Sequence, residues 1–588
     1  MQVNDRRLVQ DILNQTNIQF VIPIYQRHYS WNKDNCKKLL DDIYNCAQNK
    51  KEHFLGCIVY QQDKSMLDLI KMKFYLVDGQ QRITTTMLIA KALNLIANNI
   101  YPDDENAKYV QKKTKELIYI DRDEPDRGYK LKPSYYDEAI FKLLMNSNSL
   151  KEFEDNSLDI KDIKNSNIKT NFIYIYKSLL NEIRNNNKDI RFDIFNGLLQ
   201  LKIVDMLLAI EENPQQIFES INSLGLRLTA VDSIKNYLFL NNDSIKSFEE
   251  KWKPLQDKLI GYENMQDFIM HYLVWKKEGK TVIKANLYEE YISFAQDQIL
   301  NKNETKENLI SDLYYAAEAY EVFLRISKKY SVQINNLMQE FRDLNQTTSY
   351  AFLLRVFLDY KSKIINEEEL AKIVNFILVY VVRRLITGAQ NNLLRPLMFG
   401  LYDKLFKKNP ENKKNYYQTI YTNLVNSKND DRMKNDDEVR NSLLIDDLYD
   451  NKELCKSLLF KIENGRYPKI YPEYVSSNDV SIEHIIPKEL SEQWKLDLGN
   501  NYQEIHDRYL NTLGNLSLSS VQKNSKMSNQ SFLEKKKILL SDESKFNVLN
   551  KMLENLDKFT EKDLLNRANE LIQKVIERYN FDKPNFKD

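Results

Sequence analysis

Glycine and proline are scarce in this chain, and their scarcity limits its possible folds more than any other feature. Only 12 of each occur among 588 residues, while lysine, asparagine, leucine and isoleucine are plentiful. Folds made of many short strands need glycine and proline at their turns, whereas helices do not. The balance therefore favours helix over an all-β architecture. We expect an α+β chain that is predominantly helical.

The length of the chain predicts several domains, because 588 residues exceed what one hydrophobic core supports. Changes of pattern divide the sequence into residues 1–245, where short apolar strands alternate with helices, residues 246–430, which have a helical pattern, and residues 431–588. The formal net charge is +1, which excludes a polycation. Any nucleic-acid site must therefore be a local basic patch.

The cysteines and the apolar segments indicate a cytoplasmic protein without a membrane segment. The four cysteines, at 36, 46, 57 and 455, form no CxxC pair. Their spacing excludes the familiar zinc frameworks and fits a reducing compartment. The N-terminus is polar, unlike a signal peptide. The most apolar run, residues 373–386, ends in two arginines and is too short for a span, so we expect a buried helix there.

Local patterns predict several elements that position the motifs. "FLGCIVY" (residues 54–60) and "KFYLVDG" (residues 73–79) are rich in β-branched and aromatic residues, which is typical of strands. Residues 84–100 and 230–240 have helical spacing. Residues 426–442 are polar and dense in charge, which predicts a loop or linker between domains.

One C-terminal segment, "SIEHIIPKEL" (residues 481–490), places a titratable pair, Glu483 and His484, in a short predicted strand. A turn at Gly514-Asn515, a strand "LSLSS", a polar loop and a lysine-rich helix follow. Strand, loop, strand and helix is the order of a ββα metal finger. Asn524 lies nine residues after Asn515 (524 − 515 = 9), enough for a strand and a loop that turns back.

These residue types suit phosphodiester hydrolysis. Histidine is the side chain best able to deprotonate water near neutral pH, so His484 is the candidate general base. A hard ion such as Mg²⁺ (or Mn²⁺) takes oxygen ligands, for which Glu483 and Asn524 are the candidates. Strand alternation places Glu483 and His484 on opposite faces. Asn515 would fix the hairpin or orient the imidazole.

Positive charge for a DNA backbone comes from lysines after the second strand, at 523, 526 and 535 to 537. We expect Lys523, Lys526 and Lys535 to contact DNA. Asn529 is an alternative to Asn524 as the metal-binding amide. The alternative to a nuclease site is a solvated Glu483 and a His484 that merely packs on the hairpin. His53, His271 and His506 are expected at ordinary surface or core positions.

A second group of motifs, "IPIYQRHYSW" and "DGQQR", lies near the N-terminus. A strand ends before Asp78 and Gly79, and a helix begins shortly after, so its free N–H groups and dipole suit a phosphate. Arg27 and Arg82 add bidentate donors, and glutamine amides can bind a base or a sugar. The alternative is an ordinary Asp-Gly turn with solvated polar residues, which "DGQQR" alone would favour. The candidate nucleotide-binding residues are Tyr25, Gln26, Arg27, Asp78, Gly79, Gln80, Gln81 and Arg82.

Taken together, these segments resemble the GmrSD-type type IV restriction endonucleases. "EHIIP" and "GNLSLSSVQKN" are similar to the HNH, or His-Me finger, motif of the C-terminal domain in that family. "IPIYQRHYSW", "DGQQR" and "FESINSLGLRLTAVDSIKNYLF" (residues 218–239) are similar to its ParB/sulfiredoxin-like N-terminal domain, and "VVRRLITG" (residues 381–388) to a helix in its middle region. The motifs occur in the expected order along the whole chain.

The resemblance implies a function for each region. The N-terminal ParB-like domain would bind and hydrolyse a nucleoside triphosphate, often GTP, and sense modified phage DNA. No GxxxxGK[ST] P-loop is present in the sequence, so that chemistry would use a different scaffold. The helical middle would couple this domain to an HNH-like nuclease that acts in anti-phage defence. A homo-oligomer is a further expectation. The alternatives are a nucleotide-binding, DNA-associated regulator with an inactive nuclease domain, and a plain NTPase.

Overall fold

The computed structural model describes residues 2–24, 26–63, 72–121, 128–157, 167–185, 190–209, 211–212, 214, 217, 229–239, 245–259, 261–389, 391–465, 480–541 and 546–584. The chain divides into two compact units, Met1–Phe248 and Glu249–Asp588. The predicted boundary after residue 430 falls inside the second unit, and the division into three domains stays a prediction.

A six-stranded mixed sheet organises the first unit, with strand order β1-β6-β3-β4-β2-β5. β1 and β6 are antiparallel, β6 and β3 parallel, β3 and β4 antiparallel, and β4, β2 and β5 parallel to one another in turn. The two strands expected at residues 54–60 and 73–79 are confirmed as β3 and β4. The strands are β1 (Gln2–Arg7), β2 (Ile18–Val21), β3 (His53–Gln62), β4 (Met72–Asp78), β5 (Leu131–Lys132) and β6 (Leu201–Leu208).

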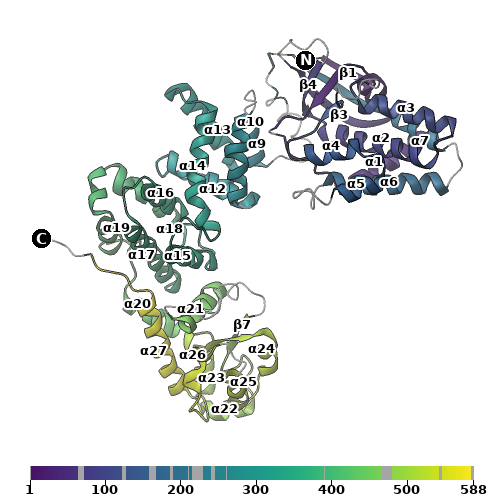
Figure 1. The fold of residues 1–588 in the computed structure, drawn as a ribbon. Coiled ribbons are helices and arrows are strands. Elements are labelled where there is room, and N and C mark those ends of the chain that lie inside the picture. The colour runs from purple at the N-terminus through teal and green to yellow at the C-terminus, as the bar shows by residue number, and fades with distance from the viewer. Residues whose placement is uncertain are drawn as a thin grey trace. The chain divides into compact units, whose positions relative to one another are not determined.

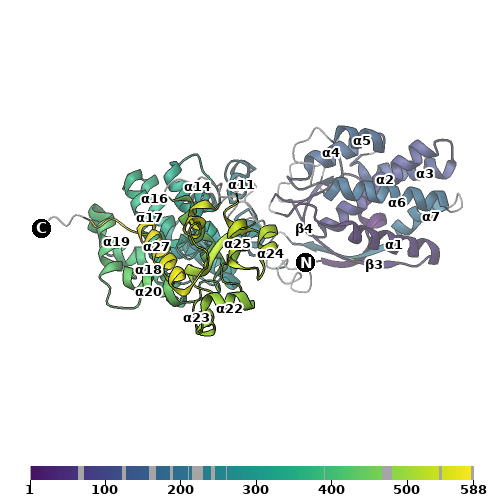
Figure 2. The ribbon, with the colours of Figure 1, turned by 90° about the horizontal axis from the view of Figure 1, so that it is seen from below.

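Helices gather against one side of this sheet, where α1, α2, α6 and α7 can be followed in Figures 1 and 2. The apolar core beneath them joins helix residues such as Leu40 and Leu88 to strand residues such as Phe20 and Ile203. The helices expected at residues 84–100 and 230–240 are confirmed as α2 and α9. The helices are η1 (Leu8–Leu13), α1 (Lys33–Asn49), α2 (Gln80–Ile100), α3 (Glu105–Ile118), α4 (Glu138–Asn146), α5 (Leu150–Asn156), α6 (Asn167–Asn185), α7 (Ile190–Leu199), α9 (Ala230–Phe239) and α10 (Ile245–Ser247).

The second unit begins with a long run of helices, as its composition predicts. The apolar run at residues 373–386 lies in α17, most of which is buried. This part contains η4 (Phe248–Trp252), which starts at the unit boundary, and then α11 (Lys253–Leu259), α12 (Tyr262–Lys276), η5 (Lys284–Asn286), α13 (Leu287–Lys302), α14 (Lys306–Leu324), α15 (Val332–Asp343), α16 (Tyr350–Lys361), α17 (Glu367–Ile386), α18 (Asn391–Tyr402), η6 (Asp403–Lys407), η7 (Pro410–Asn415) and α19 (Tyr416–Val425).

A two-stranded antiparallel sheet, β7 with β8, follows in the second unit and is surrounded by short helices; it is called the hairpin below, although α22 and α23 connect its strands. The expected strand at residues 516–520 is confirmed as β8. The elements are α20 (Asp436–Ile445), α21 (Lys452–Asn464), β7 (Val480–His484), α22 (Glu492–Leu498), α23 (Tyr502–Tyr509), η9 (Leu513–Asn515), β8 (Leu516–Ser520), α24 (Val521–Met527), α25 (Phe532–Leu539), α26 (Asn547–Asn550), η10 (Lys551–Leu553) and α27 (Glu561–Arg578).

Two predicted loops are wrong in part, because local capping forms helices there. Residues 426–442 were expected to be irregular, but α20 begins at Asp436 behind a capping box in which Asn435 and Glu438 bond each other's backbone. The polar segment after β8 is helix α24, whose N-cap Ser520 accepts from the Lys523 amide. None of the helices in the described ranges combines the length and apolarity needed to cross a membrane.

Candidate functional site

The β7–β8 hairpin places both members of the titratable pair inside the second unit. Glu483 pairs with Ser517 and His484 with Leu516 across the two strands. Only 4% of Glu483 and 7% of His484 is exposed. The two side chains have different partners, as expected for neighbours on a strand. Burial of two ionisable groups at one strand end needs specific partners to be stable.

Asn515 fixes the turn that follows His484. Its Oδ1 accepts from the Ile486 amide at 2.7 Å, and its Nδ2 donates to the carbonyls of Ile486 at 3.0 Å and Leu510 at 2.8 Å. All three side-chain bonds go to backbone groups, and the residue is fully buried. Of the two roles expected for this asparagine, the geometry matches the fixing of the hairpin rather than direct contact with the imidazole.

A hydrogen-bonded chain, Asp447–Asn511–His484, orients the imidazole. Asn511 Nδ2 donates to Asp447 Oδ2 at 2.7 Å, and the His484 Nε2···Asn511 Oδ1 distance is 3.0 Å. A carboxylate can only accept, so the amide nitrogen of Asn511 faces Asp447 and its oxygen faces His484. Nε2 therefore carries the proton in this chain, and Nδ1 is the nitrogen that is left to accept one.

Burial keeps this imidazole neutral. Desolvation lowers the pKa of His484 to about 4, against the hydrogen bond to Asn511, which raises the pKa. The positive charges of Lys488 and Lys535 contribute to this lowering of the pKa, and the carboxylate of Asp447 opposes it. The ring of Tyr449 also packs edge-on against the imidazole, with centroids 4.7 Å apart. His484 is thus a free base at neutral pH.

Lys535 neutralises the neighbouring carboxylate. Its ammonium donates to Glu483 Oε1 at 2.7 Å and to the His484 carbonyl at 2.7 Å, and only 1% of the side chain is exposed. Burial raises the pKa of Glu483, and the lysine opposes that shift. Lys535 was expected to contact DNA at the surface. In the structure it is buried against β7 instead, because α25 presents it inward to the carboxylate.

Asn524 comes from α24 and lies beside the same strand. Its Nδ2 donates to the Ile482 carbonyl at 3.0 Å, so Oδ1 is the amide atom that a metal would use. A carboxylate and an amide oxygen fit Mg²⁺, which keeps several waters and needs few protein ligands. The described residues contain no group of three or more His, Cys, Asp or Glu side chains that could hold a metal. Asn529, the alternative amide, is exposed after the end of α24.

The other two candidate DNA contacts lie on α24. Lys526 is exposed, whereas Lys523 is half-buried and donates from Nζ to Ser541 Oγ at 3.0 Å. The structure thus brings Glu483, His484, Asn515 and Asn524 together at one hairpin and leaves Lys526 at its surface.

The two N-terminal motifs also meet, at the end of β4. Gln26 is buried and donates to the Val77 carbonyl at 2.9 Å. Gln81 accepts from the amides of Ser30 at 2.9 Å and Trp31 at 3.3 Å. Both glutamines therefore bind the chain itself and hold the loop of the first motif against the start of α2. Tyr25 lies outside the described residues, and so do residues 218–228 of the third N-terminal motif.

The start of α2 depends on Gly79. Its φ is +93°, and a Cβ there would lie 2.8 Å from Ile58 Cγ1, so only glycine fits. Arg82 donates to the carbonyls of Leu55 at 3.1 Å and Cys57 at 3.0 Å, and its Nη1 lies 3.6 Å from Asp78 Oδ2. Gln80 is buried and Arg27 is half-buried. Nucleotide binding by these residues stays a prediction.

Asp447 and Asn511 were not among the candidates from the sequence. They precede and follow β7 by tens of residues, and neither lies in a recognisable motif. Asn511 stands four residues before Asn515 in "YLNTLGN", and this spacing was the only available signal. Asp447 gave no such signal, because its contact with Asn511 depends on the fold of the segment between α20 and α21.

Comparison with protein families matches both ends of the chain. The N-terminal domain of the GmrSD restriction endonucleases matches residues 9–239, and the C-terminal domain of the same enzymes matches residues 433–574. A comparison with curated proteins found no match. The two family domains occur here in one polypeptide and in the order that the motifs indicate. The chain therefore belongs to the GmrSD-type type IV restriction endonucleases.

Proposed function

We propose that the second unit is a metal-dependent DNA endonuclease in which His484 is the general base. The observation that supports this most directly is the chain Asp447–Asn511–His484, which holds one imidazole nitrogen protonated and leaves the other to accept a proton. A buried histidine with no task would not need an oriented tautomer. Oriented imidazoles of this kind serve proton transfer in enzymes.

His484 would take a proton from the attacking water at Nδ1. The free base is fully populated at neutral pH because burial lowers the pKa of His484 to about 4. Once the ring is protonated, Asn511 Oδ1 continues to accept from Nε2 and so stabilises the charged form. Asn515 keeps the histidine at a fixed place by binding the backbone of Ile486.

Glu483 and Asn524 would hold the metal, Mg²⁺ or Mn²⁺. Such an ion, when bound, would neutralise charge that develops on the phosphate and the leaving oxygen. Lys535 contacts Oε1 of Glu483, so Oε2 is the oxygen that a metal would reach without displacing the lysine. The exposed Lys526 on the adjacent helix would contact the DNA backbone.

The first unit would bind a nucleoside triphosphate, GTP in particular, and regulate cleavage of modified phage DNA. One support is the start of α2, where the backbone N–H groups of the first turn and the helix dipole favour a phosphate. The other is Arg27, which follows directly after Gln26, the residue that holds this loop against β4. The cleavage assay described next, run with and without nucleotide, shows whether the nucleotide activates or restrains cleavage.

The decisive experiment is a cleavage assay on phage DNA, unmodified and base-modified. It compares the wild type with His484→Ala, in Mg²⁺ or Mn²⁺, with and without GTP or ATP. We expect cleavage by the wild type and a loss of at least about a hundredfold in the variant, the usual contribution of a general base. His506→Gln is the matched control, since His506 Nε2 donates to the Pro487 carbonyl at 2.9 Å and glutamine keeps a donor.

The rival function is a nucleotide-binding regulator whose hairpin does not cut DNA. The contact that favours it is the buried pair of Lys535 and Glu483, in which an ammonium already neutralises the carboxylate. Binding of DNA or nucleotide without cleavage, unchanged in His484→Ala, would establish this rival and refute the nuclease.

A further inference from the structure

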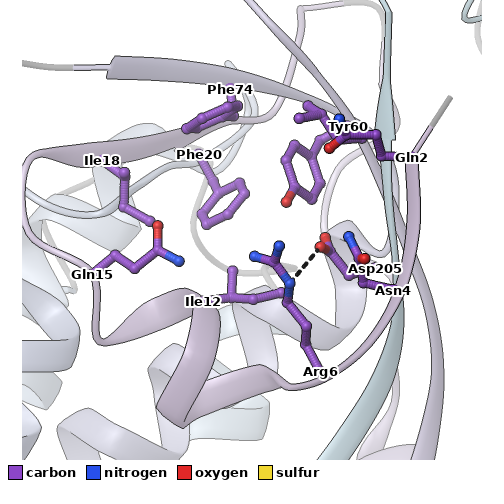
Figure 3. Close-up of a pocket in the computed structure, with 11 residues that line it drawn as sticks. Gln2, Asn4, Arg6, Ile12, Gln15, Ile18, Phe20, Tyr60, Phe74 and Asp205 are labelled. Atoms are coloured by element: carbon purple, nitrogen blue, oxygen red, sulfur yellow. Dashed lines mark ion pairs between the residues drawn. The ribbon is translucent and has the colours of Figure 1, made fainter.

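Each unit contains an ion pair with a buried carboxylate, and the two pairs differ in how far water reaches the cation. In the first unit, Arg6 Nε lies 3.2 Å from Asp205 Oδ2, and 1% of the Asp205 side chain is exposed against 38% of Arg6. The pair faces a cavity of about 120 Å³ that the aromatic rings of Phe20, Tyr60 and Phe74 also line (Figure 3). The Tyr60 side chain bonds to the Asp205 carboxylate as well. Water therefore reaches the guanidinium of this pair and can screen its charge.

The pair of Glu483 and Lys535 in the second unit is closed to water at both members. Only 5% of the Glu483 side chain and 1% of the Lys535 side chain is exposed, and Nζ lies 2.7 Å from Oε1. The ammonium also donates to the His484 carbonyl at 2.7 Å, so it cannot leave without breaking a second buried contact. Burial raises the pKa of Glu483, and among the described residues Lys535 is the only charge that opposes this shift. The two charges therefore cancel each other inside the fold.

A divalent ion at Glu483 would have to bind beside this ammonium. Oε2 is the oxygen that such an ion would reach while Lys535 stays on Oε1. The second candidate ligand, the amide oxygen of Asn524, carries no charge. The ion would therefore leave the buried site with two excess positive charges. Such an excess is costly, because charges that are shielded from water repel one another more strongly than charges in water.

A DNA phosphate would reduce this excess. Each phosphate of the backbone carries one negative charge, and a metal that assists cleavage lies against the phosphate on which charge develops. Removal of the Lys535 ammonium would lower the excess by the same amount. The lysine and the phosphate therefore act on the metal in opposite directions through the same Coulomb interaction.

We propose that Lys535 makes metal binding at Glu483 conditional on DNA. The ammonium weakens the binding of Mg²⁺ or Mn²⁺ to the free protein, and a DNA phosphate beside the metal restores it. This inference rests on the proposed metal-dependent endonuclease function, and adds that the site takes up its metal together with its substrate. By linkage, the metal must raise the affinity for DNA by the same factor as DNA raises the affinity for the metal.

The first measurement is Mn²⁺ binding to the full chain without DNA, followed by electron paramagnetic resonance of the free ion. Lys535→Met should bind Mn²⁺ more tightly than the wild type by about tenfold or more, since the repulsion from one nearby charge exceeds the energy of a tenfold change. Lys537→Met is the matched control, because Lys537 is an exposed lysine on the same helix α25, and it should bind as weakly as the wild type. Addition of Glu483→Gln to Lys535→Met should abolish the gain, which locates the ion at the carboxylate.

The second measurement adds DNA and needs no variant of Lys535, so it decides the proposal even where Lys535→Met does not fold. It uses His484→Ala, which leaves DNA uncut, and a short duplex from the phage DNA that the wild type cleaves. We expect the duplex to tighten Mn²⁺ binding by about tenfold or more, after correction for the ions that DNA alone binds. Mn²⁺ should tighten binding of the duplex by the same factor.

Two kinds of failure are distinguishable. Mn²⁺ binding that is as tight without DNA as with it, or a folded Lys535→Met that binds no more tightly than the wild type, overturns the inference and leaves the endonuclease intact. Absence of Mn²⁺ binding in every protein, with and without DNA, overturns the inference together with the proposed metal dependence. The cleavage assay with His484→Ala tests the endonuclease itself, and none of these binding measurements depends on cleavage.

Discussion

At the scale of single residues, the tautomer of His484 depends on an acceptor two side chains away. Asp447 determines which way the Asn511 amide faces, and Asn511 determines which imidazole nitrogen holds the proton. Asp447 is itself held by the Asp450 amide, which donates to its Oδ1 at 2.9 Å. The orientation of the histidine is therefore set by residues that would not touch the reacting atoms in the proposed mechanism.

Asp447→Asn should lower kcat for DNA cleavage by roughly a hundredfold with little change in KM. An asparagine at 447 can donate as well as accept, so Asn511 is free to turn and the imidazole can lose the required tautomer. Nitrogen-15 NMR of the His484 ring should show protonation shifting from Nε2 toward Nδ1. Asp497→Asn, at a half-buried position on α22, is the control. An unchanged tautomer together with unchanged kcat would remove Asp447 from the mechanism.

At the scale of elements, the lysine-rich helix α25 has a structural task. The sequence pattern indicated a DNA-binding face, but Lys535 points inward and joins α25 to β7. A buried ion pair contributes little net stability, yet removal of one partner is costly because the other charge remains buried. The pair therefore fixes the place of α25 more than it adds stability.

Lys535→Met should destabilise the second unit by about 3 kcal/mol, because Glu483 keeps a buried charge without a partner. The double variant Lys535→Met with Glu483→Gln should recover most of that loss. Urea denaturation measures both, and Lys526→Met, at an exposed position, should change the free energy of unfolding by less than about 0.5 kcal/mol. Equal losses in the single and double variants would show that packing, not charge, holds the helix.

At the scale of the whole molecule, ionic contacts to one buried carboxylate join helices from the middle and the C-terminal part of the second unit. Glu340 on α15 is fully buried and binds Arg578 Nη2 at 2.7 Å, Lys461 Nζ at 3.1 Å and the Tyr579 hydroxyl at 2.5 Å. Arg383 on α17 donates to the Tyr579 carbonyl at 3.0 Å. The helical middle and the hairpin region therefore share one set of contacts.

Glu340→Gln should destabilise the second unit by about 3 kcal/mol at pH 7, since two half-buried cations lose their buried counter-charge. Burial opposes ionisation, but Lys461 and Arg578 hold the pKa of Glu340 below its ordinary value. A carboxyl with a lowered pKa stabilises the fold above the unfolded pKa of about 4.3 and loses that effect as the pH falls through the folded value. The difference between wild type and variant in urea denaturation should therefore shrink in acid. Glu368→Gln, in an exposed pair with Lys372, should show no such difference. A difference that is the same at pH 7 and in acid would contradict the ionic role.

Motif order and local periodicity were sufficient to predict much of this protein. The strands β3, β4 and β8, the helices α2, α9 and α17, and the family follow from short segments, because alternation, helical spacing and motif spacing are properties of neighbouring residues. The proximity of Glu483, His484, Asn515 and Asn524 was predicted from the order of the motifs, although α22 and α23 lie between the two strands.

Contacts between distant segments were decided only by the tertiary structure. The orientation of His484 depends on Asp447, the burial of Lys535 on the packing of α25, and the aromatic cavity on strands as far apart in sequence as β1 and β6. Local pattern says which face of an element is apolar, but not which distant side chain will meet it there. By itself the sequence determined the elements, the motifs and the family of this protein. Only the tertiary structure determined which distant partners orient or neutralise its polar groups.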